Sequence, residues 1–311
     1  MTGDVQMEER AHKSVMLREV LDALAPRSGG VYVDATLGRG GHAEAILDAC
    51  APDGVLIGVD RDPDALTETA PRLSRFGARA KLVHGRFSEL PQLLAEAGHP
   101  QVDGLIADLG VSSPQLDRGE RGFSFRSEGP LDMRMDPTRG ETARELIERL
   151  SEEELANVIY RLGEERKSRA VARSIKRAES EGELATTRDL ARAVGRVMGP
   201  RRGGIDPATR TFQALRIAVN GELEELDALL AALPQLLADG GVAAILTFHS
   251  LEDRAVKWAF RGDARMAPLT KKPVIASDAE QSENARSRSA KLRCARRIPR
   301  AEEGAEEGGA A

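Results

Sequence analysis

The sequence predicts an α/β fold in which a largely parallel sheet is interrupted by an inserted all-helical domain. Between residues 31 and 60, two short β-branched runs flank a glycine-rich turn and a helical pattern, which indicates a βαβ unit. Two further apolar runs, 80–84 and 102–109, alternate with helical patterns. The alternation then stops, and a buried strand pattern returns only at 242–248. The two halves of the sheet must therefore come together across the insertion.

Helix signals separate the expected strands. Ser14 can cap a first helix that Pro26 ends, and Asp62 with Pro63 at the first helical position starts another after the second strand. The remaining core elements are expected at 88–97, from 209 to about 221 and on toward 237 with a break near Pro234, and as an antiparallel edge hairpin of 266–274 with 290–298.

Residues 116–206 are expected to form the inserted helical domain. It begins within a polar, turn-rich stretch, 110–140, whose length is typical of a functional loop. We therefore expect a discontinuous core of 1–115 and 207–300, followed by a disordered acidic tail at 301–311. Helical patterns follow the loop at 141–150, 151–162, 164–180 and 187–198, the second opening with a capping box of Ser151 and Glu154.

Composition bounds the class of protein. The chain has 311 residues, of which 41% are hydrophobic, enough for a sizeable core and for two structural units. Two distant cysteines, Cys50 and Cys294, do not make a disulfide framework and favour a reducing, cytoplasmic location. No apolar run approaches the length that spans a bilayer, so no membrane segment is expected. The five histidines are scattered and no cysteine pair has ligand spacing, so no metal site is expected.

Charge is unevenly distributed along the chain. The net charge is −5, yet basic side chains cluster at 166–202 and at 286–300. Such clusters could bind the phosphates of a nucleic acid. The alternative for any one cluster is a solvated helix face.

The glycine turn of the βαβ unit is the candidate ligand site. Gly38, Gly40 and Gly41 let the backbone approach a ligand closely, and the free N–H groups of the next helix point to the same place. Asp60 ends the second strand 20 residues after Gly40, the offset at which an acid can bind ribose hydroxyls. The pattern therefore predicts a pocket for an adenosine-containing cofactor.

The details of the turn favour S-adenosyl-L-methionine over a dinucleotide. No glycine lies three residues after Gly41, as a dinucleotide turn requires, and no triphosphate-binding loop is present. Asp34, just before the turn, would repel a pyrophosphate but attract an ammonium or a sulfonium. A glycine-rich turn in an ordinary α/β enzyme is the alternative.

A set of unusual motifs runs through the chain in a fixed order, at 34–42, 58–63, 108–115, 121–126, 129–139, 163–166, 207–216, 248–254 and 283–289. Together these motifs resemble one family, the bacterial 16S ribosomal RNA cytosine-N4-methyltransferases (the MraW, or RsmH, family). The resemblance covers nearly the whole chain from His12 to about Arg297, although the spacer at 271–278 is shorter than in some members.

The resemblance implies a Rossmann-like methyltransferase core whose helical insertion recognises the substrate. It implies transfer of a methyl group from S-adenosyl-L-methionine to the N4 amine of a cytidine in the decoding region, with 16S rRNA or the small ribosomal subunit as partner. The cofactor contacts that it implies are Gly40, Gly41, His42, Asp60, Phe87, Asp108 and Gln115.

Asp108 is the candidate catalytic residue. The cytosine amine is a poor nucleophile because its lone pair is delocalised, so a catalyst should accept its hydrogen bonds and hold it in line with the methyl group. Many amino-methylating enzymes place an acid-Pro-Pro-aromatic turn after the fourth strand, whereas Asp108 is followed here by Leu-Gly-Val-Ser-Ser-Pro. Asp108 either borders both cofactor and amine or only binds the cofactor, and the sequence leaves both open.

RNA contacts are less well determined by the sequence. Phe123, Phe125, Phe248 and Trp258 could stack on a flipped base, with core packing as the alternative for each. A Ser-His-Asp hydrolase triad is excluded because the residues of that type near 249–253 are crowded into one turn. The candidate RNA contacts are Ser112, Ser113, Phe123, Arg134, Arg210 and His249.

Three rival functions can be separated from this one. An NAD-dependent oxidoreductase would be stabilised against heat by NAD rather than by S-adenosylhomocysteine. A non-catalytic RNA-binding assembly factor would have no need of the intact glycine turn, and a small-molecule methyltransferase would have no need of the insertion and the basic clusters. The oligomeric state is open, with a homodimer among the alternatives.

Overall fold

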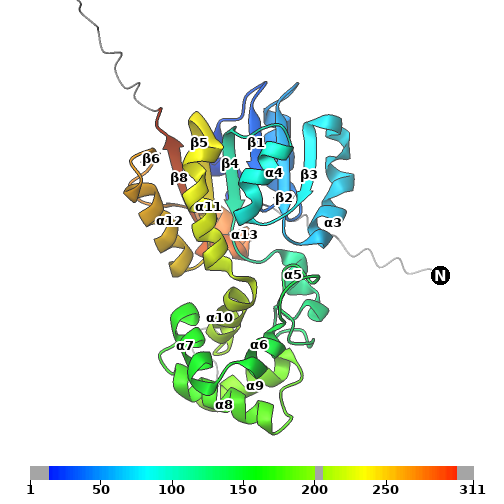
Figure 1. Ribbon diagram of the computed structural model, residues 1–311, viewed down its shortest axis with the longest axis vertical. Helices are drawn as coiled ribbons and strands as arrows, with labels where there is room; N and C mark the ends of the chain where they lie inside the picture. The colour runs from blue at the N-terminus through cyan, green and yellow to red at the C-terminus, as the bar shows by residue number, and fades with distance from the viewer. Residues whose placement is uncertain (1–13, 200–205, 300–311) are drawn as a thin grey trace, which may run out of the picture. The chain divides into compact units, whose positions relative to one another are not determined.

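The computed structural model describes residues 14–199 and 206–299, which divide into two compact units (Figure 1). The first unit contains the chain up to Asp60, Asp64–Leu109 and the chain from Asp227 onward. The second unit contains Arg61–Pro63 and Gly110–Leu226. The expected acidic tail at 301–311 lies outside the described residues, as do the arginines at 201, 202 and 300 of the two basic clusters.

The first unit is built on an eight-stranded sheet within the described residues, with the order β3-β2-β1-β4-β5-β8-β6 and with β7 also paired to β8. The five strands from β3 to β5 are parallel, which confirms the predicted α/β class. The strands are β1 (Val31–Asp34), β2 (Val55–Asp60), β3 (Ala80–His84), β4 (Val102–Asp108), β5 (Leu237–Thr247), β6 (Met266–Pro268), β7 (Val274–Ile275) and β8 (Lys291–Arg297).

The antiparallel part of the sheet differs from the expected edge hairpin. Strand β8 pairs with β5 on one side and with β6 and β7 on the other, so it is an interior strand. Its side chains Leu292, Cys294 and Ala295 are buried, as an interior position requires. The sequence pattern predicted that β8 pairs with the segment 266–274. It did not predict that β8 also pairs with β5.

Helices surround this sheet and bury its apolar strands. In β5 the side chains from Val242 to Thr247 are all buried, which is typical of a central strand covered on both faces. One core cluster joins Tyr32, Leu56 and Ile106 of the sheet to Ile46 of a helix. The helices are α1 (Leu17–Leu24), α2 (Gly41–Ala49), α3 (Pro63–Leu73), α4 (Leu90–Glu96), α11 (Glu222–Leu236), α12 (Ser250–Gly262) and α13 (Asp278–Glu283).

Two details of these helices differ from expectation. Ser14 does not cap α1. The residue at the N-cap position is Met16, which adopts a left-handed conformation and makes no capping hydrogen bond with its side chain. Pro234 does not break α11 but lies in its last turn, two residues before its end at Leu236. Both differences arise at helix ends, where the residues that terminate a helix depend on surrounding packing.

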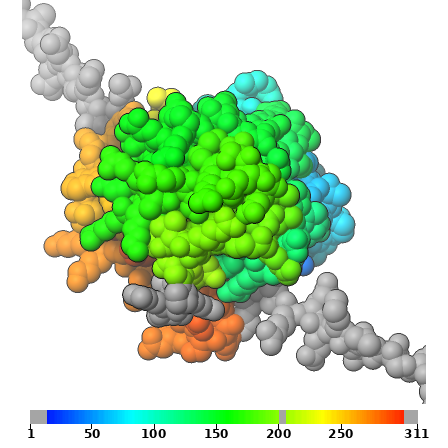
Figure 2. Space-filling model, turned by 90° about the horizontal axis from the view of Figure 1, so that it is seen from below, coloured from blue at the N-terminus to red at the C-terminus, as the bar shows by residue number. Residues whose placement is uncertain are grey.

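The second unit is helical, as predicted, but its bounds are wider than 116–206. Helix α10 belongs to it, because Gly163 at the end of α7 lies so close to α10 that a Cβ there would be 2.5 Å from the Arg210 carbonyl oxygen. The described helices are α5 (Ser113–Asp117), α6 (Ala143–Arg149), α7 (Glu152–Gly163), α8 (Ser168–Ser180), α9 (Thr187–Met198) and α10 (Thr209–Asn220). Figure 2 shows the outer surface of this unit.

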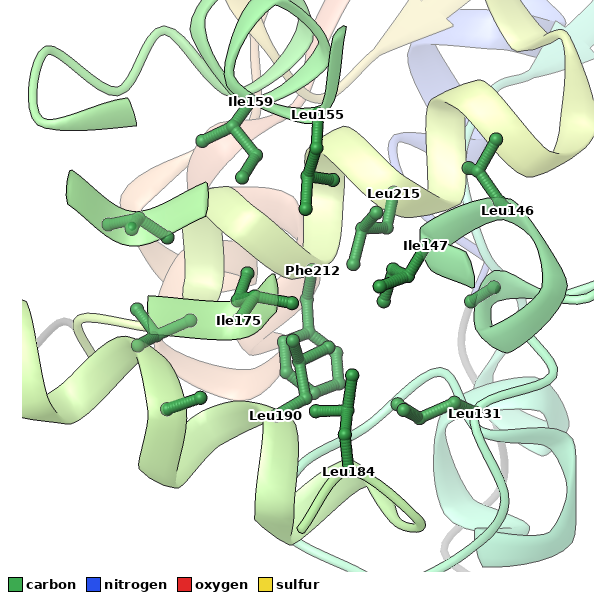
Figure 3. Close-up of a cluster of buried hydrophobic side chains, with 14 of the residues drawn as sticks. Leu131, Leu146, Ile147, Leu155, Ile159, Ile175, Leu184, Leu190, Phe212 and Leu215 are labelled. Atoms are coloured by element: carbon green, nitrogen blue, oxygen red, sulfur yellow. The ribbon is translucent and has the colours of Figure 1, made fainter. Parts of the chain in front are cut away.

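The helices of the second unit enclose a single apolar cluster (Figure 3). Leu155 and Ile159 of α7, Ile175 of α8, Leu190 of α9 and Phe212 of α10 point into it. The predicted capping box at Ser151 and Glu154 is present, with the Ser151 N–H donating to the Glu154 carboxylate at 2.8 Å. Helix α8 begins at Ser168 rather than at 164, because Glu164 adopts a left-handed conformation that ends α7.

The turn-rich stretch 110–140 is held in place by buried polar contacts. The Asn220 amide donates to the Met133 carbonyl oxygen and accepts from the Met135 N–H, both at 2.7 Å. Arg121 donates to the carbonyl oxygens of Arg134 and Met135 at 3.1 and 2.9 Å. These bonds satisfy backbone groups that no strand or helix would pair, so the loop is a fixed part of the second unit.

Candidate active site

Three acids end neighbouring parallel strands of the first unit. Asp34 ends β1, Asp60 ends β2 and Asp108 ends β4. The sheet order β2-β1-β4 places β1 between the other two, at the point where the strand order reverses. Ligands of open α/β sheets bind at the carboxyl ends of the strands at such a reversal.

The glycine turn after β1 is hydrogen-bonded to all three strand ends. The Gly38 N–H donates to Asp60 Oδ2 at 2.8 Å, and the Thr36 N–H donates to Asp34 Oδ1 at 3.1 Å. The Asp108 N–H donates to Thr36 Oγ1 at 2.6 Å. Asp60, predicted to bind a ribose, therefore also fixes the shape of the turn.

Gly40 and Gly41 are required by the packing of the turn. Gly40 has a φ of 73°, and a Cβ there would collide with the methyl group of Thr69. A Cβ at Gly41 would collide with the Ser14 hydroxyl. Side chains are thus excluded where α2 begins, and its free N–H groups stay accessible for a ligand.

His42, in the first turn of α2, is buried. Its Nε2 atom lies 3.0 Å from the Val15 carbonyl oxygen, so a proton on Nε2 would donate to that oxygen. The ring interacts electrostatically with both Asp34 and Asp108. His42 is therefore part of the predicted site, although a contact with the methionine carboxylate stays a prediction.

Burial sets the ionisation of two of the acids. Asp34 is 1% exposed, and burial raises its pKa to about 6, while His42 and the Thr36 N–H act in the opposite direction. Burial also raises the pKa of Asp108, opposed by His42 and Arg286. The Oδ1 atom of Asp108 is shielded from solvent and has no hydrogen-bond partner in the part of the chain that the structure describes.

This edge fits a cationic, adenosine-bearing ligand. A buried acceptor without a partner is costly and is expected where a ligand supplies the missing donor. Three carboxyl groups around one turn would disfavour a pyrophosphate and favour a sulfonium or an ammonium. The residues present therefore suit S-adenosyl-L-methionine, while the roles of Asp60 at the ribose and of Asp34 and Asp108 at the positively charged end stay predictions.

The two remaining predicted cofactor contacts lie in different units. Phe87 begins a short 3₁₀ turn (Phe87–Glu89) after β3 in the first unit and is partly buried. Gln115, in the second unit, donates to Asp62 Oδ2 at 2.8 Å and accepts from the Ser112 N–H at 3.0 Å. Asp62 also forms an ion pair with Arg121 at 2.9 Å. No local sequence signal predicted this Asp62-Gln115-Arg121 network, because Asp62 lies far from Gln115 and Arg121 along the chain.

The candidate RNA contacts of the second unit are mostly engaged in structural interactions. Ser112 caps α5, which begins at Ser113. Phe123 is buried in the apolar cluster of the unit, so its ring is not available to stack on a base. Arg134 makes two bonds to Asp132, at 2.8 and 2.7 Å. Arg210 is 57% exposed, donates to the Glu164 carbonyl oxygen at 3.3 Å and lies 3.8 Å from the Glu165 carboxylate.

His249, at the end of β5 in the first unit, caps α12. Its Nδ1 atom accepts from the Glu252 N–H at 3.4 Å, and its Nε2 atom lies 3.0 Å from the buried Glu252 carboxylate. Asp253 instead contacts Arg293 at 2.7 Å and Lys291 at 3.2 Å, and these bonds outweigh burial and lower its pKa. Asp253 is thus directed to β8, which agrees with the exclusion of a hydrolase triad.

The basic cluster at 166–202 is largely a solvated, ion-paired helix surface. Arginines of α8 and α9 lie within 3.3 Å of carboxylates, and their side chains are largely exposed. This result favours the solvated helix face over phosphate binding for these members. The pairs are Arg173 with Glu152, Arg177 with Glu181, Arg188 with Glu128, Arg192 with Asp189 and Arg196 with Glu183.

Two classes of site find no support within residues 14–199 and 206–299. No group of three or more His, Cys, Asp or Glu side chains is arranged to hold a metal ion there. No helix in those ranges is long and apolar enough to cross a membrane.

Comparison with known proteins identifies close relatives. A protein of Sorangium cellulosum named ribosomal RNA small subunit methyltransferase H is 64% identical over 292 residues, covering 94% of this chain and 92% of that protein. Proteins of the same name from Prochlorococcus marinus and Citrifermentans bemidjiense are 53% and 48% identical, covering 93% and 94% of this chain and 94% and 100% of those proteins.

Solved structures give only weak overall similarity. A putative rRNA-methylase from Clostridium thermocellum aligns with a TM-score of 0.46 and 12% identity, covering 92% of this chain and 100% of that one. NSun6 from Pyrococcus horikoshii aligns with a TM-score of 0.48 and 12% identity, covering 93% of this chain and 53% of that one.

Residues 9–298 match the MraW methylase family. The chain therefore belongs to the MraW methylase family, and its methyl donor is S-adenosyl-L-methionine.

Proposed function

We propose that this chain transfers a methyl group from S-adenosyl-L-methionine to the N4 amine of a cytidine in the decoding region of 16S ribosomal RNA, in the cytoplasm. The observation that carries the proposal is the buried Oδ1 atom of Asp108 at the carboxyl end of β4, which has no hydrogen-bond partner among residues 14–199 and 206–299. The names of the relatives support ribosomal RNA of the small subunit as the substrate.

Asp108 suits the chemistry that an exocyclic amine requires. As a carboxylate, it can accept a hydrogen bond from the amine and draw the nitrogen toward tetrahedral geometry. When bound, S-adenosyl-L-methionine supplies an electrophilic methyl group, whose bond to sulfur breaks with the electron pair staying on sulfur. As the nitrogen forms its bond to the methyl carbon it becomes acidic, and its proton passes to Asp108 and then to solvent.

Other residues of the first unit hold the reacting groups. Asp60 and the glycine turn fix the adenosine end, while His42 favours the charged form of Asp108. The target base must leave its stack to reach a buried site. We assign recognition of the surrounding RNA to the second unit, with Arg210 as the first candidate contact because its side chain is exposed.

The test is methyl transfer from radiolabelled S-adenosyl-L-methionine to small ribosomal subunits purified from cells that lack the enzyme, followed by nucleoside analysis. We expect label in N4-methylcytidine. Label only in another nucleoside would contradict the proposed acceptor. No label in any RNA, together with S-adenosylhomocysteine binding, would contradict RNA methylation altogether. Asp108→Asn, which keeps the size of the side chain, is the matched control.

A further inference from the structure

A segment near the C-terminus of the described chain returns to the carboxyl edge of the sheet. Helix α13 is anchored to the N-terminal part, because Glu280 Oε1 accepts from the Met16 N–H at 2.8 Å. A 3₁₀ turn (Ala285–Ser289) follows, capped by the Asn284 side chain, which accepts from the Arg286 N–H at 3.2 Å. Ser287 is 1% exposed and donates to the Asn284 carbonyl oxygen at 2.8 Å. The turn is therefore stabilised by local, partly buried hydrogen bonds.

This turn carries Arg286 to the strand ends that form the site. The Arg286 guanidinium carbon lies 5.9 Å from the centroid of the Phe248 ring, within the range of a cation–π contact. Phe248 directly follows β5, two residues after Leu246, which pairs with Asp108 of β4. Phe248 and Asp108 thus lie at the ends of adjacent strands, with the Arg286 guanidinium near the Phe248 ring and within electrostatic range of Asp108. The Oδ1 atom of Asp108 has no hydrogen-bond partner among the described residues.

We infer that Arg286 is a positioning residue for methyl transfer, whose guanidinium, held against Phe248, favours the negative charge on the Asp108 carboxyl group where the target amine binds. This inference rests on the proposed function, in which Asp108 meets the amine. Arg286 acts through Asp108, and Phe248 restricts where the guanidinium can lie.

The charged groups around Asp108 come from four elements. His42 of α2 and Arg286 favour the carboxylate, whereas burial, Glu252 of α12 and Asp34 of β1 disfavour it. The sum raises the pKa of Asp108, with burial as the main cause. Removing the Arg286 charge removes one of the two groups that favour the Asp108 carboxylate, so Asp108 should stay protonated to a higher pH. A protonated Asp108 cannot take up the amine proton.

The experiment compares Arg286→Gln, Arg286→Lys and the wild-type protein. Single-turnover methylation of small ribosomal subunits is measured across pH with saturating S-adenosyl-L-methionine. A positioned base contributes about 10²–10⁴-fold to a rate, and we expect Arg286→Gln to lose on the order of tenfold at neutral pH. The acid limb of its pH–rate profile should move to higher pH, and Arg286→Lys should restore much of both.

A second measurement does not depend on turnover. Carboxyl ¹³C NMR of aspartate-labelled protein follows the titration of Asp108 directly, with Asp108→Asn identifying the resonance. The titration should move to higher pH in Arg286→Gln but stay in place in Arg288→Gln, a matched loss of charge in the same turn, where Arg288 donates to the Gln281 carbonyl oxygen at 2.9 Å.

The outcomes separate the inference from the proposed function. An unmoved acid limb and an unmoved titration in a folded Arg286→Gln protein would overturn the inference, as would an equal shift in Arg288→Gln. A wild-type protein that labels no cytidine would overturn the proposed function, and with it the role of Arg286 at the amine. The NMR titration would then still decide whether Arg286 sets the charge on Asp108.

Discussion

The carboxyl edge of the sheet and the helices of the second unit hold charged side chains in opposite environments. At the sheet edge, Asp34 is buried and Asp108 has a shielded oxygen without a partner among the described residues. On α8 and α9, arginines are exposed and lie beside carboxylates. Exposed pairs contribute little to stability, whereas buried, incompletely paired charge is unfavourable unless a ligand uses it. The difference distinguishes the candidate active site from a solvated surface.

The largest effect should come from a change at Asp108. Asp108→Asn removes the acceptor of the amine proton, and we expect single-turnover methylation to fall by about 10²–10⁴-fold. Affinity for S-adenosylhomocysteine, measured by calorimetry, should change much less. A variant that loses this affinity but keeps its rate at saturation would show that Asp108 only binds the cofactor.

Loss of a partly buried ion pair of the second unit should lower the stability of the protein rather than its reaction rate. Arg216 makes two 2.7 Å bonds to Glu222, with side chains that are 15% and 9% exposed. Arg216→Gln leaves Glu222 without its cation, and the free energy of unfolding should fall by about 3 kcal/mol in urea titration. An unchanged midpoint would mean that the pair contributes no net stability despite its burial.

Asp34 should destabilise the folded protein at neutral pH. Burial raises its pKa from 3.8 to about 6, so the folded protein holds this proton more tightly than the unfolded chain. The stability that it contributes is complete below pH 3.8 and is lost as the pH rises through about 6. Asp34→Asn should raise the free energy of unfolding at pH 7, by up to about 3 kcal/mol, and flatten this pH dependence.

The same variant should bind its cationic ligand less well. Saturating S-adenosyl-L-methionine should therefore raise the melting temperature of the wild-type protein more than that of Asp34→Asn. Equal stabilisation of both proteins would argue against Asp34 as a partner for the positive charge.

The glycine turn allows strain and collision to be measured separately. Gly40→Ala combines a φ of 73° with a collision against Thr69, and we expect a loss of about 1–3 kcal/mol. Gly182 has the same φ of 73° but open space around it. Gly182→Ala should therefore lower the free energy of unfolding by less than Gly40→Ala. If urea titration showed an equal loss in the two variants, the collision with Thr69 would not contribute to the effect of Gly40→Ala.

The smallest effect should come from an exposed pair on the helices. Arg173 lies 3.3 Å from Glu152, with side chains that are 73% and 45% exposed. Arg173→Gln should change the free energy of unfolding by no more than about 0.5 kcal/mol. If this variant instead weakened binding to small ribosomal subunits by tenfold, the cluster would have to be treated as an RNA-binding surface.

Local signals in the sequence determined most elements and the centre of the site. The βαβ unit, the capping box at Ser151 and the acids that end β1, β2 and β4 were all predicted from short patterns. Such signals are complete within a few residues, because strand alternation, helix caps and positive-φ glycines depend on neighbours along the chain. The family motifs added the order of these elements and the nature of the cofactor.

Only the tertiary structure decided which distant residues meet. It placed β8 between β5 and β6, joined α10 to α7, buried Phe123, linked Gln115 to Asp62 and brought Arg286 beside Phe248 and Asp108. Each of these depends on packing between segments that are far apart in sequence, and no local periodicity encodes such partners. The residue types of the site could therefore be predicted from the sequence, whereas the environment that sets the charge of its acids depends on the fold.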